Sequence, residues 1–143
     1  MRGPNKESNP WPDDHPIPVA GAILDRGDEI LLVRDTCLDE FWLVSGWLEA
    51  WESAEDAMVR EVREEVGLEV SAPEIVGSYS CKPIGLNFVF IVYAAQVAET
   101  AQVVIGHEIA EARWYRKDAL PNWPADSPAA TAMSDYLGHG RAS

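Results

Sequence analysis

The sequence predicts an α/β fold in which a mixed β-sheet lies between helices. Short apolar segments with strand character stand before and after one long amphipathic segment, residues 53–67, that has helical periodicity. Residues 87–97 are almost continuously apolar, which is typical of a central strand covered on both faces. A second capped helical segment follows near the end of the chain. Strands on both sides of a helix, with another helix at the end, favour a layered sheet-and-helix domain.

The first part of the chain predicts a β-hairpin. Residues 17–24 and 29–34 read as two strands, and Asp-Arg-Gly-Asp at 25–28 is a good turn between them. Residues 41–44 form a short strand candidate that leads into the long helical segment.

The long helix has two recognisable ends. Ser53 can act as N-cap with Asp56 three residues later, which is close to a capping box, and Gly67 supplies a C-terminal stop. At about 100° per residue, the apolar positions fall on one stripe. These are Met58, Val59, Val62 and Val66.

The second half predicts more strands and a last helix. Strands are expected at 70–81, 87–97 and 112–115, and a turn of helix is expected near 117–120. Ser127 as N-cap and Pro128 at the first helical position open a final helix that ends by Gly138.

Length and composition indicate one domain. The chain has 143 residues, and we expect a Pro-rich, extended or partly disordered arm over 1–16 and a single domain over 17–143. The formal net charge of −13 argues against an electrostatic nucleic-acid binder. Cys37 and Cys81 offer neither a disulfide framework nor a zinc motif, and no leader or membrane-spanning pattern is evident. We therefore expect a cytoplasmic protein with no membrane partner.

Three glutamates in the long helix predict a cation site. Glu61, Glu64 and Glu65 stand at i, i+3 and i+4, so their carboxylates share one side of the helix and repel one another. A solvated acidic helix face is the alternative for these residues alone. A hard divalent cation held by oxygen ligands would relieve the repulsion. Arg60 is spaced i, i+4 from Glu64, so it could orient that carboxylate.

The segment around these glutamates resembles the signature of the Nudix hydrolases. All nine fixed positions of that signature match, namely Gly46, Glu52, Arg60, Glu61, Val62, Glu64, Glu65, Gly67 and Leu68. The resemblance implies an α/β/α sandwich and a pyrophosphatase that uses Mg²⁺ or Mn²⁺. Its substrate would be a small-molecule nucleotide: a nucleoside diphosphate linked to another group, such as ADP-ribose, a dinucleotide, a nucleotide sugar or a nucleoside triphosphate. A homodimer is also expected from the resemblance alone.

The same resemblance suggests roles for individual residues. It implies Glu61, Glu64 and Glu65 as metal ligands, the carbonyl of Ser45 as a further ligand, and one of the glutamates as the base that deprotonates water. Glu52 would support the site through a salt bridge to Arg60, although it could instead be a simple partner of the helix dipole. Glu108, favoured over Glu111, is the candidate for an additional ligand or base from a downstream loop, and an ordinary surface acid is the alternative for both.

Substrate contacts are predicted at two aromatic and two basic residues. Trp47 and Trp51, in the loop before the helix, could stack on a base, whereas Trp42 and Phe88 are expected to be packing residues. Arg34 and Lys82 could contact phosphate oxygens. Family members often carry Gly where this chain has Trp51. Because Trp cannot adopt the positive φ angles that Gly tolerates, we expect the loop to depart from the usual family shape.

Within the family, the chain is most similar to a bacterial branch near the NADH diphosphatases. It departs from them in two ways, because residues 78–83 read Ser-Tyr-Ser-Cys-Lys-Pro instead of a Ser-Gln-Pro-Trp stretch, and two cysteines cannot form their four-cysteine zinc ribbon. A catalytically silent Nudix-like module that senses a nucleotide or binds a protein is the main alternative. An isomerase of isoprenoid diphosphates is a remote one, because Cys37 or Cys81 would have to serve it without any supporting motif.

Overall fold

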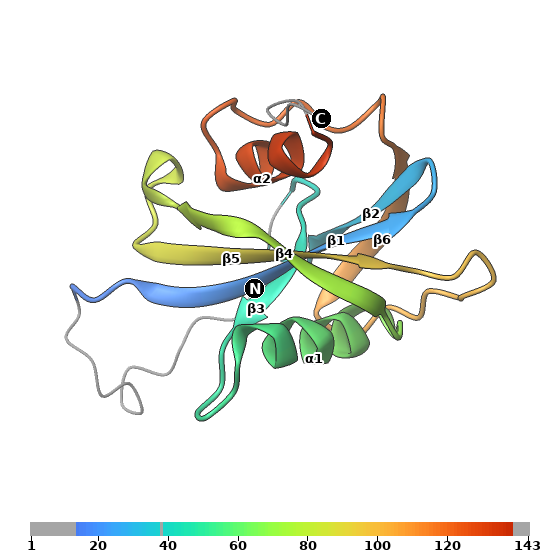
Figure 1. Ribbon diagram of the computed structural model, residues 1–143, viewed down its shortest axis with the longest axis horizontal. Helices are drawn as coiled ribbons and strands as arrows, with labels where there is room; N and C mark the ends of the chain where they lie inside the picture. Colours follow the sequence, from blue (N-terminus) through green and yellow to red (C-terminus); the bar gives the residue numbers. More distant parts are fainter. Residues whose placement is uncertain (1–13, 38, 139–143) are drawn as a thin grey trace.

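The chain folds into a mixed six-stranded sheet with one helix on each face (Figure 1). The computed structural model describes residues 14–37 and 39–138, so most of the arm predicted over 1–16 lies outside the described residues. The strands are β1 (Ile17–Arg26), β2 (Glu29–Asp35), β3 (Val44–Trp47), β4 (Ser71–Ser80), β5 (Phe88–Gln96) and β6 (Ile109–Arg116). The helices are α1 (Ala54–Val66) and α2 (Pro128–Tyr136), and a 3₁₀ turn, η2, covers Lys82–Ile84.

The sheet order explains why β1 and β5 are the most apolar strands. The order is β4-β5-β1-β2-β6, and β3 pairs with β1 outside this path. β5 runs parallel to β1, while the other pairs are antiparallel. Both central strands are covered on two faces, as the continuous apolar run at 87–97 predicted.

Two core clusters fill the spaces between the sheet and the helices. On the α1 side, Leu24, Leu31 and Val44 pack against Met58 and Val62. On the α2 side, other strand residues pack against Ala129, Ala132 and Met133. The predicted α/β/α sandwich is therefore confirmed.

The ends of α1 form as the sequence predicts. The Ser53 side chain accepts a hydrogen bond from the Asp56 backbone N–H at 3.1 Å. Gly67 adopts φ 67°, and its N–H donates to the Arg63 carbonyl at 3.1 Å. These caps set the rotation of α1 and thus the side on which its glutamates lie. Neither of the two described helices is long and apolar enough to cross a membrane.

Two element predictions are wrong in detail. Residues 41–43 contribute only an isolated bridge from Trp42 to Val33, and the strand begins at Val44 instead. Pairing with β1 makes a strand of Ser45 and Gly46, which have little strand propensity of their own. Residues 117–120 form a turn, in which Ala119 N–H donates to Arg116, and not a helix, because Pro121 disfavours helical backbone before it.

Candidate active site

Helix α1 holds two glutamates against the sheet and a third at its edge. Glu61 and Glu65 are each only 6 % exposed. The Glu64 side chain is 48 % exposed, so the three carboxylates share a side of the helix but not the same environment. A simple solvated acidic face is thus excluded, because two of its three members are buried among apolar core residues.

Strand β3 provides a close backing for this carboxylate pair. A Cβ atom at Gly46 would come within 2.2 Å of the Glu61 carboxyl group, so a residue with a side chain cannot occupy this position without moving Glu61. A backbone hydrogen bond from Ser45 reaches Glu65. The glycine of the signature therefore has a steric reason. Ser45 lies beside the buried pair, and the role of its carbonyl as a metal ligand stays a prediction.

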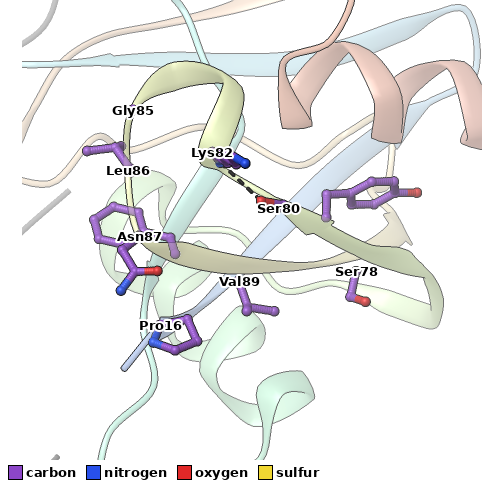
Figure 2. A pocket seen from close by; sticks show the side chains of 10 residues that line it. Pro16, Ser78, Ser80, Lys82, Gly85, Leu86, Asn87 and Val89 are labelled. Atoms are coloured by element: carbon purple, nitrogen blue, oxygen red, sulfur yellow. Dashed lines mark hydrogen bonds between the residues drawn. The ribbon is translucent and has the colours of Figure 1, made fainter. Parts of the chain in front are cut away.

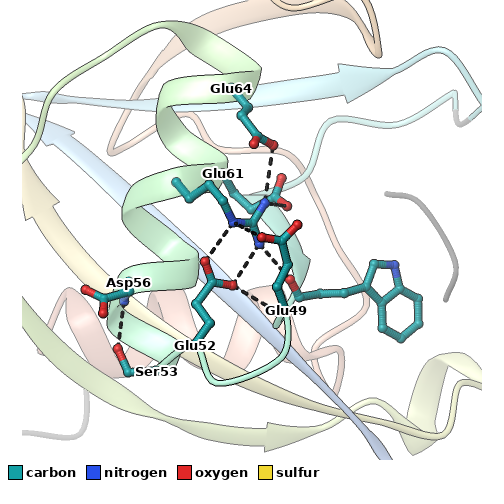
Figure 3. A network of polar contacts seen from close by, with 8 residues as sticks. Glu49, Glu52, Ser53, Asp56, Glu61 and Glu64 are labelled. Atoms are coloured by element: carbon teal, nitrogen blue, oxygen red, sulfur yellow. Dashed lines mark hydrogen bonds and ion pairs between the residues drawn. The ribbon is translucent and has the colours of Figure 1, made fainter. Parts of the chain in front are cut away.

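Arg60 is the centre of an ion-pair network with Glu52, Glu61 and Glu64. Figure 3 shows how these three acidic side chains converge on it. Its Nε and Nη2 donate to the two oxygens of Glu52 at 2.7 and 2.9 Å. Its Nη1 donates to Glu61 at 2.9 Å and to Glu64 at 3.3 Å. The predicted Arg60 contacts with Glu52 and Glu64 are both present, and the direct contact with buried Glu61 is an addition that spacing alone did not indicate.

The sequence also missed Glu49. Its carboxylate lies 3.3 Å from Arg60 Nε, and its backbone N–H donates to Glu52 Oε1 at 2.9 Å. Its spacing of three residues from Glu52, across a tight turn, was the signal that could have indicated this contact. Glu49 and Glu52 together fasten the loop before α1 to Arg60.

The buried carboxyl groups of Glu61 and Glu65 have too little positive charge around them for both to be ionised. Burial, the Glu61 charge and a hydrogen bond from Glu65 to Glu61 raise the pKa of Glu65 to about 9. Burial also raises the pKa of Glu61, against the opposing effect of Arg60. Hydrogen bonds from Arg60 lower the pKa of Glu52. Without a cation, the Glu61–Glu65 pair is therefore most stable when it keeps one proton.

This donor set fits a hard divalent cation. A buried carboxyl pair that retains a proton can exchange it for a metal ion, and carboxylate and carbonyl oxygens are the ligands that Mg²⁺ prefers. Among the described residues, no three acidic, histidine or cysteine side chains already converge as a metal cluster. Arg60 instead holds Glu61 and Glu64 in their present positions.

These pKa shifts predict how the stability of the metal-free protein depends on pH. Because the folded state raises the pKa of Glu65 from 4.5 to about 9, it binds more protons than the unfolded state between these values. The contribution of protonated Glu65 to the free energy of unfolding is complete below about pH 4.5 and is lost as the pH rises through 9. In EDTA, the melting temperature should fall from pH 6 to pH 9, and Mg²⁺ should restore more of it at pH 9 than at pH 6. Thermal unfolding of wild-type protein and of Glu65→Gln measures this pH dependence. An equal change of melting temperature with pH in the two proteins would contradict the raised pKa of Glu65.

Trp47 connects the network to a nearby pocket. Its carbonyl accepts from Arg60 Nη2 at 3.0 Å, while its ring packs edge-on against Phe88 with 4.8 Å between centroids. Phe88 also lines a pocket of about 670 Å³ framed by the end of β4, the η2 turn and the start of β5 (Figure 2). The Trp47 indole N–H is buried and has no hydrogen-bond partner within the described part of the chain.

The pocket contains one of the two predicted basic residues. Lys82 is the only charged side chain among the described residues that line it. The full lining is Pro16, Ser78, Tyr79, Ser80, Lys82, Gly85, Leu86, Asn87, Phe88 and Val89. Phe88 is partly packed in the core, as predicted, yet it also faces this pocket.

Arg34 lies elsewhere. In β2, Leu31 and Val33 face α1 whereas Ile30 and Leu32 face α2, so alternation places Arg34 on the α2 face, opposite to the glutamates. It contacts Glu111 at 3.5 Å on the neighbouring strand. The structure therefore does not bring Arg34 to the carboxylate cluster, because successive side chains of a strand point to opposite faces of the sheet.

Glu108 belongs to a loop that is attached to the helix near Glu65. Gly106 N–H donates to the Glu65 carbonyl at 2.9 Å, and the Glu108 carbonyl accepts from Thr36 N–H at 3.1 Å. A Cβ at Gly106 would lie 2.4 Å from the Glu64 carbonyl oxygen, so glycine permits this close approach. Glu108 is half-buried beside the site region, and its catalytic role stays a prediction.

Trp51 has the positive φ angle that its side chain disfavours. Its φ is 65°, so the expectation that Trp could not follow the usual shape of this loop is wrong. Its side chain is fully exposed.

The fold and the signature residues together define the class of protein. The model of the NUDIX domain matches residues 15–136, so the chain belongs to the Nudix family. Relatives include the NAD-capped RNA hydrolases NudC of Pseudomonas putida W619, 38 % identical over 115 residues, and of Pseudomonas aeruginosa LESB58, 38 % identical over 118 residues. These matches cover 79 and 80 % of this chain but 41 and 42 % of the relatives, so the chain spans less than half of their length.

Solved structures agree on the fold. An ADP-ribose pyrophosphatase from Streptococcus suis superposes with a TM-score of 0.72 at 23 % identity, covering 89 % of this chain and 93 % of that one. A UDP-X diphosphatase gives 0.73 at 20 % identity, covering 94 and 68 %. At these identities the likeness establishes the fold alone. The NudC relatives, in turn, support the expected similarity to the branch near the NADH diphosphatases.

Proposed function

We propose that this chain hydrolyses a diphosphate bond in a nucleoside diphosphate linked to another group, with water attacking phosphorus. The observation that carries the proposal is the buried Glu61–Glu65 pair, held beside Arg60 on the signature helix. Two acidic groups removed from water need a positive partner, and a diphosphate needs its negative oxygens neutralised. One divalent-metal site satisfies both requirements.

In this proposal Glu61, Glu64 and Glu65, with the Ser45 carbonyl, hold the metal ion, Mg²⁺ or Mn²⁺. When bound, such an ion neutralises phosphate oxygens and lowers the pKa of a coordinated water. Arg60 positions Glu61 and Glu64, and Glu52 in turn fixes Arg60. Glu61, Glu64 and Glu108 are the candidate bases that accept the proton of the attacking water.

We infer that a small dinucleotide related to NADH is the preferred substrate. The NudC relatives are named for hydrolysis of an NAD cap, and Lys82 lines the pocket beside Phe88. We propose that Trp47 and Trp51 stack on the bases of the substrate and that Lys82 contacts a phosphate. The expectation of no nucleic-acid partner is not confirmed, because the name of those relatives includes RNA. We favour the free dinucleotide since a net charge of −13 does not promote binding to a phosphate backbone.

We also infer a cytoplasmic homodimer. Cys37 and Cys81 are free thiols, as expected in a reducing compartment. The dimer rests on family resemblance alone.

A panel of substrates tests the proposed function. Purified protein with Mg²⁺ or Mn²⁺ should cleave at least one of ADP-ribose, NADH, dinucleoside polyphosphates, nucleotide sugars and nucleoside triphosphates, with the fastest turnover for a dinucleotide. No cleavage of any compound would overturn the proposal in favour of a silent nucleotide-sensing or protein-binding module.

A further inference from the structure

The loop between β5 and β6 is fastened by its backbone to the last turn of α1. Val104 N–H donates to the Val66 carbonyl at 2.9 Å, and Gly106 N–H donates to the Glu65 carbonyl, also at 2.9 Å. Both carbonyls belong to the end of the helix, where no intrahelical donor is available to them. We call residues 104–106 the clamp segment. It connects a part of the chain outside the signature to the helical turn that carries Glu64 and Glu65.

The contact is so close that it has no space for a side chain at position 106. A Cβ atom at Gly106 would overlap the Glu64 carbonyl oxygen and lie 3.8 Å from the Glu65 Cα atom. Across the same contact, a Cβ atom at Gly67 would lie 3.0 Å from the Val104 carbonyl oxygen. Gly106 does not have a positive φ angle, so the close approach to the helix is the reason for glycine there.

The last turn of α1 is an unfavourable place for two carboxylates. The helix ends at Val66, and the helix dipole disfavours negative charge at a C-terminal end. Glu65 is also only 6 % exposed and is repelled by the charge of Glu61. Helix ends open more readily than helix centres, and these charges add to that tendency.

The clamp segment opposes this opening of the helix end. Its two N–H groups bring hydrogen-bond donors to the carbonyls of the turn that holds the carboxylates. Val104 and Ile105 are 67 and 44 % exposed, so hydrogen bonds contribute more to this attachment than packing of these two side chains. Metal ligands must be held within about 0.5 Å of their productive positions. An attached last turn therefore fixes both exposed Glu64 and buried Glu65 relative to Glu61.

We propose that the clamp segment positions Glu64 and Glu65 for the metal ion, and that Gly106 is the positioning residue that permits the attachment. The proposal rests on the proposed function and deepens it, because it adds to the metal site an element that lies outside the signature. Coupling between two binding events is reciprocal. If the clamp segment favours metal binding, metal binding must favour attachment of the clamp segment by the same factor.

Amide hydrogen exchange of the wild-type protein measures this reciprocal effect. Saturating Mg²⁺ should slow exchange of the Val104 and Gly106 N–H groups by at least about fivefold, the lower end of typical coupling between sites. The Thr131 N–H, which donates to the Ser127 carbonyl at 3.0 Å in the first turn of α2, is the reference and should keep its rate. Unchanged exchange at Val104 and Gly106, or equal slowing at Thr131, would overturn the proposal.

Gly106→Ala tests the proposal from the other direction. The added methyl group pushes the clamp segment away from the Glu64 carbonyl, so affinity for Mn²⁺ should fall by roughly 10- to 100-fold, as for other groups that orient metal ligands. Gly27→Ala is the matched control, because Gly27 has φ 66° in the turn between β1 and β2 and no atom within 4 Å of an added Cβ. It strains the backbone away from α1 and should keep Mn²⁺ affinity within about twofold.

Calorimetric titration of the substrate-free proteins with Mn²⁺ gives these affinities, and thermal unfolding in EDTA gives the stabilities. A lower melting temperature of Gly106→Ala with wild-type Mn²⁺ affinity would show a role in folding alone and would overturn the clamp. Failure of wild-type protein to bind Mn²⁺ would instead refute the proposed metal site, and the clamp with it. The hydrogen-exchange measurement needs no variant, so it decides the question even if Gly106→Ala does not fold.

Discussion

Glu65→Gln should abolish turnover while leaving the fold intact and the metal-free protein at least as stable. We expect a loss of kcat on the order of 10³-fold, because the variant removes one of the two buried carboxylates that we propose as metal ligands. The amide has nearly the same shape, and it removes the charge that burial disfavours. In EDTA at pH 8 its melting temperature should therefore equal or exceed that of wild type.

The stabilisation by Mg²⁺ should be lost in the same variant. Steady-state kinetics and thermal unfolding with and without metal measure the two effects together. Glu69→Gln is the matched control, because Glu69 is an exposed acid just beyond α1 that forms an ion pair with Arg63, away from Arg60. Retention of wild-type kcat by Glu65→Gln would refute the metal role of Glu65.

Arg60→Met should give the largest loss of stability of any single change in the site. The Arg60, Glu52 and Glu61 side chains are only 19, 13 and 8 % exposed, so removing the guanidinium leaves two nearly buried carboxylates without their cation. We expect a loss of about 2–4 kcal/mol in the free energy of unfolding, somewhat below the figure for fully buried pairs. Metal affinity should fall by about 10- to 100-fold because Glu61 and Glu64 lose the group that positions them.

Arg63→Met provides the comparison for this change. Arg63 lies in the same helix and pairs with Glu69, but their side chains are 56 and 74 % exposed, so its loss should cost less than about 1 kcal/mol. Chemical denaturation of both variants gives the free energies, and Arg60→Lys should recover part of the loss. Equal stability of Arg60→Met and Arg63→Met would contradict the central role of the network.

The elements with strong local signals could be predicted from the sequence. Ser53, Gly67 and Ser127 fixed the helix ends through local hydrogen bonds, and the apolar run at 87–97 identified the central strand β5. Strand β3 could not be placed in this way, because Ser45 and Gly46 become a strand only by pairing with β1.

The candidate site shows the same division. Helical spacing brought Glu61, Glu64 and Glu65 together, but it could not reveal that two are buried while Glu64 is exposed. The charge of Arg34 suggests a phosphate contact, but strand alternation places this residue on the face of the sheet opposite to the glutamates. The backbone preference of Trp opposes the positive φ of Trp51, whereas the contacts of Arg60 with Glu49 and Glu52 hold the turn in this geometry.

Hydrolysis in ¹⁸O-labelled water tests the central claim most directly. Wild-type protein with Mg²⁺ should cleave a dinucleotide such as NADH into two monophosphates, with one ¹⁸O atom in a single product and none without metal. Glu65→Gln should give no labelled product under the same conditions. Absence of cleavage across the whole substrate panel, or unlabelled products formed equally well in EDTA, would contradict a metal-dependent attack of water on the diphosphate.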